Sequence, residues 1–154
     1  MTGRRLIYVC LALFFHFTAI LAAPGGQERR SAPDNLEQAR AYLRKSDYNS
    51  ALSILLRYIQ KEEHSKSVDT LNLMNAYYNV GGIYSVYSNF AQALDVYEKG
   101  YRLSLVSGNS GMQFKFLNNM IGAGCNIGNA AYAERLNEKV KELKGVPRGQ
   151  LLFY

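Results

Sequence analysis

The sequence has little cysteine and little proline, and each scarcity limits the fold. It holds 2 cysteines and 3 prolines in 154 residues. Cys10 lies in an apolar N-terminal stretch, and the remaining Cys125 cannot form a disulfide within one chain, so no disulfide framework supports the fold. We expect Cys125 to be a small buried residue, since free cysteine is among the most buried residue types. Scarce proline permits long helices, because proline breaks a helix interior.

Catalytic and metal-binding patterns are also missing. His16 lies in the N-terminal apolar stretch, and His64 stands alone in a polar segment, so the two histidines form no cluster for a metal or for base catalysis. The glycines within 81–82 and 122–124 fall inside expected helices and do not follow a strand, so we expect them to allow close helix packing and not to bind phosphate. The sequence predicts a protein that is not an enzyme and needs no metal or cofactor.

The charged residues are too few and too dispersed for a nucleic-acid binder. The formal net charge is +6, from 18 basic and 12 acidic residues. Two of the arginines lie in the N-terminal stretch, which leaves 16 basic residues against 12 acidic ones in the rest of the chain. These charges form no dense basic stripe, so we expect no contact with nucleic acid. With 48% hydrophobic residues, the chain has enough apolar material for a core.

Residues 1–23 are typical of a secretory signal peptide. Two arginines near the start precede the apolar run 6–20, and alanines at 22 and 23 offer a cleavage point. Residues 24–33 are rich in Gly, Arg and Ser and indicate a flexible linker. We therefore expect export to the periplasm or the cell exterior. If residues 6–23 stayed uncleaved, they would be just long enough to anchor the chain in a membrane.

Three later segments share one design, in which a short break separates two apolar helices. The breaks fall at 45–48, 87–90 and 127–130. An alanine follows each break at a matched place, and these alanines lie 42 and 40 residues apart: Ala51, Ala93 and Ala133. Because alanine lacks bulk, the second helix of each pair can approach the first closely.

The residues of each break suit the end of one helix and the start of the next. The end positions hold small or turn-tolerant residues, which permit unusual φ values: Ser46, Ser88 and Gly128. The next position in each case carries a side-chain oxygen that can cap the following helix: Asp47, Asn89 and Asn129.

Apolar spacing between the breaks predicts six helices. They are expected at about 34–45, 48–63, 68–87, 90–106, 112–126 and 130–144. A series of tyrosines at helical spacing is interpreted as packing between helices: Tyr77, Tyr84, Tyr87, Tyr97 and Tyr101.

The middle segment resembles the tetratricopeptide repeat (TPR). That family has an aromatic residue, a Leu-Gly pair, a tyrosine, an alanine and a further aromatic residue. The matching residues here are Tyr77, Val80, Gly81, Tyr84, Ala93 and Tyr97. The other two segments keep part of the pattern, which gives repeats at about 34–65, 74–107 and 114–144. Their period exceeds the family's roughly 34 residues, as in exported bacterial relatives with longer repeats. The resemblance implies an all-α fold, a TPR-like α-α superhelix of about three helix-turn-helix repeats.

The resemblance also implies a protein-protein interaction module, an adaptor or scaffold that binds a partner peptide in a concave groove. The first helix of each pair would line that groove and place these residues in it: Arg40, Arg44, Asn75, Tyr78, Asn79, Ser85, Lys115, Asn118, Asn119 and Asn126. Asparagine amides can pair with a peptide backbone. Arginine and lysine can receive a carboxylate, so we expect an acidic or carboxylate-ended peptide. The same positions could instead be solvated surface residues.

The last ten residues leave a second function open. Residues 145–149 end the last helix, and the apolar residues 150–154 then read as the start of a further repeat or as a tail that docks on 130–144. The chain could therefore be the extracytoplasmic sensory part of a longer signalling or transcription-regulating protein. A carbohydrate or small-molecule binder would need an aromatic-lined pocket, whereas we expect the tyrosines to be committed to packing.

Overall fold

The computed structural model describes residues 32–143. The predicted signal peptide (1–23), most of the predicted linker (24–33) and the tail (145–154) lie outside the described residues. Six helices form in the described part, which contains no strand. They are α2 (Ala32–Arg44), α3 (Tyr48–Glu63), α4 (Thr70–Val86), α5 (Phe90–Val106), α6 (Ser110–Asn126) and α7 (Ala130–Glu142). The predicted all-α class is confirmed, and each helix lies within about two residues of its predicted ends.

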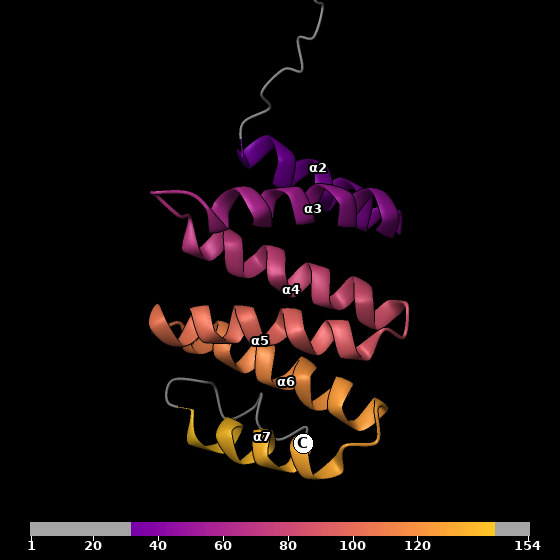
Figure 1. Cartoon of the computed structure of the whole chain (residues 1–154), viewed down its shortest axis with the longest axis vertical. Coiled ribbons are helices and arrows are strands. Elements are labelled where there is room, and N and C mark those ends of the chain that lie inside the picture. Colours follow the sequence, from indigo (N-terminus) through magenta and orange to yellow (C-terminus); the bar gives the residue numbers. More distant parts are fainter. Residues whose placement is uncertain (1–31, 144–154) are drawn as a thin grey trace, which may run out of the picture. The chain divides into compact units, whose positions relative to one another are not determined.

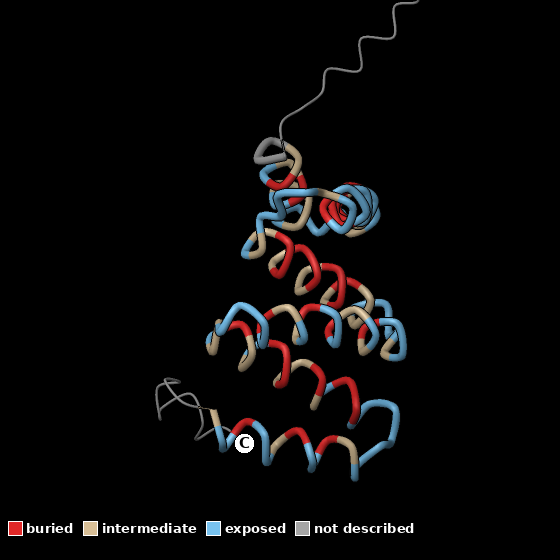
Figure 2. The backbone as a smooth tube through the Cα atoms, turned by 60° about the vertical axis from the view of Figure 1, so that its left-hand side comes forward, coloured by how far each residue is buried: buried red, intermediate tan, exposed pale blue. Residues whose placement is uncertain are grey.

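Each helix packs against the next one along the chain, and α4 also contacts α6. The helices follow one another along the long axis of the described part, with α2 and α3 at one end and α7 at the other (Figure 1). Buried positions recur along the helices (Figure 2). The three matched alanines are all buried, with exposed fractions of 0%, 0% and 6% at Ala51, Ala93 and Ala133. This agrees with the close approach that their small size predicts.

Two helical glycines make room for aromatic rings. A Cβ atom at Gly81 would lie 2.3 Å from Cε1 of Tyr97, and one at Gly100 would lie 2.2 Å from Cζ of Phe116. Neither distance is possible between real atoms, so each ring occupies the space that a side chain would need. The glycine on one helix and the ring on the next therefore fix how closely α4 approaches α5 and α5 approaches α6.

The breaks between paired helices have the conformation that their sequence predicts. Ser46 and Ser88 have a φ of 57°, and Gly128 has a φ of 76°. Gly108, between α5 and α6, adopts the same left-handed conformation with a φ of 66°. The residue after each of these donates its N–H to the carbonyl oxygen five positions earlier, at 2.8 to 3.0 Å. Each helix thereby ends in a closed turn that reverses the chain within a few residues.

Helix capping follows the prediction at two breaks and departs from it at the third. The side chains of Asp47 and Asn129 accept the N–H three residues later at 3.1 Å, as predicted. The Asn89 side chain makes no cap bond, because its amide donates to the side chain of Gln92 instead. The prediction for Asn89 is therefore wrong. Two further caps occur at Asp69 and Asn109, which precede α4 and α6.

Asn89 and Asn129 occupy equivalent places, but only Asn129 makes a cap bond. The difference in stability loss between the two alanine variants therefore measures the contribution of that bond. Asn129→Ala should lower the free energy of unfolding by about 1 kcal/mol, since one N–H at the start of α7 loses its partner. Asn89→Ala, the matched control, should lose less than half of that. Urea denaturation followed by circular dichroism measures both. Equal losses would show that the cap bond at Asn129 contributes nothing of its own.

The burial prediction for Cys125 is wrong, because its side chain is exposed. The buried face of α6 runs through Phe116, Met120, Ala123 and Gly124. Cys125 follows that face by one position, so the helical period turns it outward. The period of the helix outweighs the preference of the residue type.

Candidate functional site

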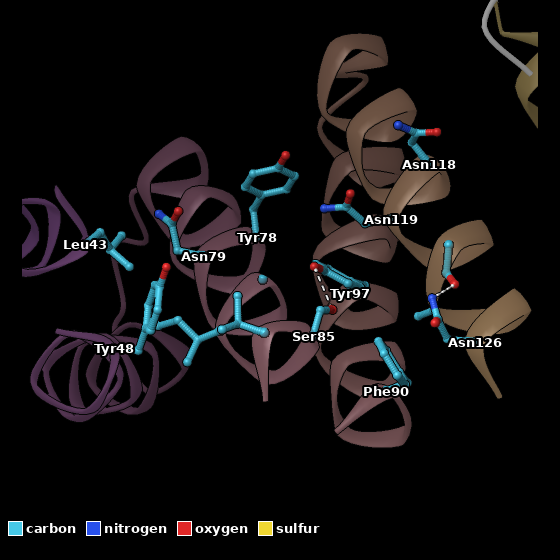
Figure 3. Close-up of a pocket in the computed structure, with 15 residues that line it drawn as sticks. Leu43, Tyr48, Tyr78, Asn79, Ser85, Phe90, Tyr97, Asn118, Asn119 and Asn126 are labelled. Atoms are coloured by element: carbon cyan, nitrogen blue, oxygen red, sulfur yellow. Dashed lines mark hydrogen bonds between the residues drawn. The ribbon is translucent and has the colours of Figure 1, made fainter. Parts of the chain in front are cut away.

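A groove of about 560 Å³ opens along the helices and receives side chains from α2 through α6. Figure 3 shows Asn79 on one side, Asn118, Asn119 and Asn126 on the other, and Tyr78 and Tyr97 between them. The residues that line it are Leu43, Tyr48, Tyr78, Asn79, Gly82, Ile83, Ser85, Val86, Phe90, Tyr97, Asn118, Asn119, Gly122, Ala123 and Asn126. All fifteen are uncharged.

Side-chain amides are the main polar groups of this groove. Within residues 32–143, the amides of Asn79 and Asn118 have no hydrogen-bond partner, and both residues are half-buried. Asn126 Nδ2 donates to the carbonyl oxygen of Gly122 at 2.8 Å, which leaves its amide oxygen available. An amide offers two donor hydrogens and one acceptor oxygen. The groove can therefore pair with a ligand that presents both donors and acceptors.

Tyr78 and Tyr97 form one aromatic wall of the groove, and both rings pack against Phe116. The ring of Tyr78 lies 6.1 Å from that of Phe116, nearly perpendicular to it, and 6.5 Å from that of Tyr97. Tyr97 is only 1% exposed, and burial raises the pKa of its hydroxyl. Its hydroxyl lies 3.4 Å from the hydroxyl of Ser85. The groove thus has a rigid wall whose tyrosine hydroxyl stays protonated at neutral pH.

The groove contains several residues that the resemblance predicted. Tyr78, Asn79, Asn118 and Asn119 all line it, together with Ser85 and Asn126. Two other predicted residues lie close by without lining it. Asn75 is half-buried one turn before Asn79 on α4. Lys115 is exposed, and its Nζ lies 5.9 Å from the centre of the Tyr78 ring.

The two predicted arginines are not part of the groove. Arg40 and Arg44 both bind Glu37 on their own helix, at 3.4 and 3.1 Å, and all three side chains are more than half exposed. Hydrogen bonds from Arg44 and then Arg40 hold the pKa of Glu37 below its ordinary value. The structure therefore does not bring these guanidinium groups together with the asparagines of α4 and α6.

Nine of the fifteen lining residues were not predicted from the sequence, and several of them lie at the beginning or end of a helix. Tyr48 and Phe90 begin α3 and α5, and Leu43 lies at the end of α2. Tyr48 also meets Tyr87 edge to face at 6.2 Å. Tyr48 and Phe90 are each the last residue of a break in the repeat pattern. That shared place was the available signal, but it was interpreted only as part of the turn.

A smaller hollow of about 380 Å³ lies elsewhere, between the start of α4 and the end of α5. Its polar groups already have partners. The Tyr77 hydroxyl donates to Glu63 at 2.5 Å, Lys99 lies 3.7 Å from the same carboxylate, and Arg102 binds Glu98 at 2.7 Å. The asparagine groove is the better candidate, because within residues 32–143 the amides of Asn79 and Asn118 are unpaired.

Neither a metal site nor a membrane span is found in the part of the chain that the structure describes. No three His, Cys, Asp or Glu side chains gather there in an arrangement that could hold an ion. None of α2 to α7 combines the length and the apolar character that crossing a bilayer requires. Comparison with family models, curated proteins and solved structures found no match to this chain.

Proposed function

We propose that this chain is an exported TPR-like adaptor, whose helical repeats form a superhelix and bind an extended segment of a partner protein. The observation that carries this proposal is the groove itself. It combines unpaired asparagine amides with aromatic walls and crosses several helices. A peptide backbone presents alternating donors and acceptors, which is the pattern that side-chain amides pair with.

Export is supported by the sequence pattern of residues 1–23 and not by the described helices. An arginine-bearing start, an apolar run and a small-residue end are the three parts of a signal peptide. A partner would then be met outside the cytoplasm.

Aromatic lining favours a second candidate, a carbohydrate binder. Four rings line the groove, those of Tyr48, Tyr78, Phe90 and Tyr97. Sugar stacking needs a free ring face, however. Tyr97 is buried, and Tyr78 has Phe116 against its ring and the Lys115 ammonium 5.9 Å from its centre. Because these ring faces are covered, the groove favours a peptide, which its side-chain amides can bind, over a sugar.

The test is affinity for peptides, measured by fluorescence anisotropy after selection from a peptide array. Asn79→Ala and Asn119→Ala should each weaken binding of the selected peptides by about tenfold, since a ligand amide would lose its partner. Gln60→Ala on α3, whose exposed side chain lies outside the groove, is the control and should bind within about twofold of the wild type.

Two results would contradict this function. One is unchanged affinity in both asparagine variants while the selected peptides still bind. The other is capture of oligosaccharides on a glycan array, with loss of that capture in the same variants and no peptide bound.

A further inference from the structure

We propose that the groove takes an uncharged, extended backbone that lies directly on the helix surface at Gly82 and Gly122. This inference rests on the proposed peptide-binding function and adds the chemical class of the ligand and the way it seats.

The charge of the ligand follows from the lining. None of the fifteen lining residues is charged. Lys115 is exposed, with its Nζ 5.9 Å from the centre of the Tyr78 ring, and the arginines Arg40 and Arg44 of α2 are paired with Glu37. A charged group that leaves water for such a groove would lose hydration without gaining an opposite charge. An uncharged segment avoids that cost.

The position of the ligand backbone follows from two glycines, Gly82 and Gly122, that helix packing does not require. A Cβ atom at Gly122 would meet nothing within 4 Å, and one at Gly82 would meet only the Tyr97 hydroxyl at 3.9 Å, an ordinary contact. Alanine would therefore fit at both places, and glycine inside a helix is less stable than alanine. By contrast, a ring fills the space at Gly81 and at Gly100. Both unexplained glycines line the groove, where a missing side chain lets a ligand backbone approach closely.

The amides stand beside these glycines on the same helix faces. Asn79 precedes Gly82 by three positions on α4, while Asn118 and Asn126 lie four positions on either side of Gly122 on α6. Residues three or four apart share one face of a helix. A backbone that lies over the two glycines would thus have an amide from each helix at its edges, positioned to accept its N–H and donate to its C=O.

The probes are labelled peptides of about ten residues that are blocked at both ends. A peptide of this length spans about 33 Å when extended. One set contains only uncharged residues, and two matched sets carry one Asp or one Lys at the centre. Anisotropy should give about tenfold tighter binding for the best uncharged peptides than for their Asp or Lys counterparts.

The matched variants place a bulky side chain inside and outside the groove. Gly82→Leu and Gly122→Leu should each weaken binding about tenfold or more, because the leucine occupies the space of the backbone. Gly111→Leu lies on α6 outside the groove, where a Cβ meets only Asn109 Oδ1 at 3.6 Å, and should stay within about twofold. Gly82→Ala and Gly122→Ala, which the fold accommodates, should lose about threefold. Circular dichroism verifies folding of each variant.

The outcomes distinguish failure of this inference from failure of the proposed peptide-binding function. Tighter binding of the Asp peptides, or full affinity in folded Gly122→Leu and Gly122→Ala, would overturn the inference and leave peptide binding standing. Failure of all three peptide sets to bind would overturn both.

Discussion

Replacing Phe116 with alanine should lower the free energy of unfolding by about 3–5 kcal/mol. The Phe116 side chain is fully buried at 0% exposure. Its ring fills the space that Gly100 leaves on α5 and meets the rings of Tyr97 and Tyr78 at 6.4 and 6.1 Å. Alanine would leave a cavity where α4, α5 and α6 come together, and neighbouring rings can fill it only in part.

Urea denaturation measures this loss, with Phe114→Ala as the matched control. Phe114 lies on the same helix but is only half-buried, so its loss should be less than half as large. Peptide affinity should also fall in Phe116→Ala, because the Tyr78 ring loses its support. A loss below about 1 kcal/mol, or one equal to that of Phe114→Ala, would contradict a central packing role for Phe116.

A single added methyl group at Gly100 should also destabilise the fold, by about 1–3 kcal/mol. Its Cβ would lie 2.2 Å from Cζ of Phe116, so the ring or the helix has to move. The matched control is Gly122→Ala on α6, which meets nothing within 4 Å. That change should raise the free energy of unfolding by about 0.5–1 kcal/mol, because alanine favours the helix.

Gly100→Ala and Gly122→Ala should change the free energy of unfolding in opposite directions, and this difference tests the close packing between α5 and α6. Adding Phe116→Leu to Gly100→Ala should recover part of the loss, because the smaller side chain leaves room for the new methyl group. If Gly100→Ala stabilised the protein as Gly122→Ala does, the approach of the two helices could not depend on that glycine.

The helices could be predicted well from the sequence, since their signals are local. The breaks at Ser46 and Ser88 each combine a small residue with a following Asp or Asn, and both serines adopt the left-handed conformation. Apolar spacing then fixes which residues lie inside. Competition between local hydrogen bonds is harder to predict, which is why Asn89 bonds to Gln92 instead of capping α5.

The groove could be predicted only in part. The asparagines of α4 and α6 follow from the repeat resemblance, because it aligns the first helices of two pairs. The arginines of α2 do not join them, since Glu37 lies on the same helix, three residues before Arg40 and seven before Arg44, and pairs with both. Tyr48 and Phe90 share the last position of their breaks, but their place in the groove depends on how α3 and α5 begin, which the spacing of apolar residues does not show.

Chemical-shift mapping by nuclear magnetic resonance tests peptide binding in the groove most directly. An isotopically labelled protein is titrated with the uncharged, end-blocked peptides that bind best. The largest changes are expected in the side-chain amides of Asn79, Asn118 and Asn119 and in the backbone amide of Gly122, with little change at Arg40. Changes centred on Arg40 and its neighbours on α2, with the four groove signals unmoved, would contradict the proposed site.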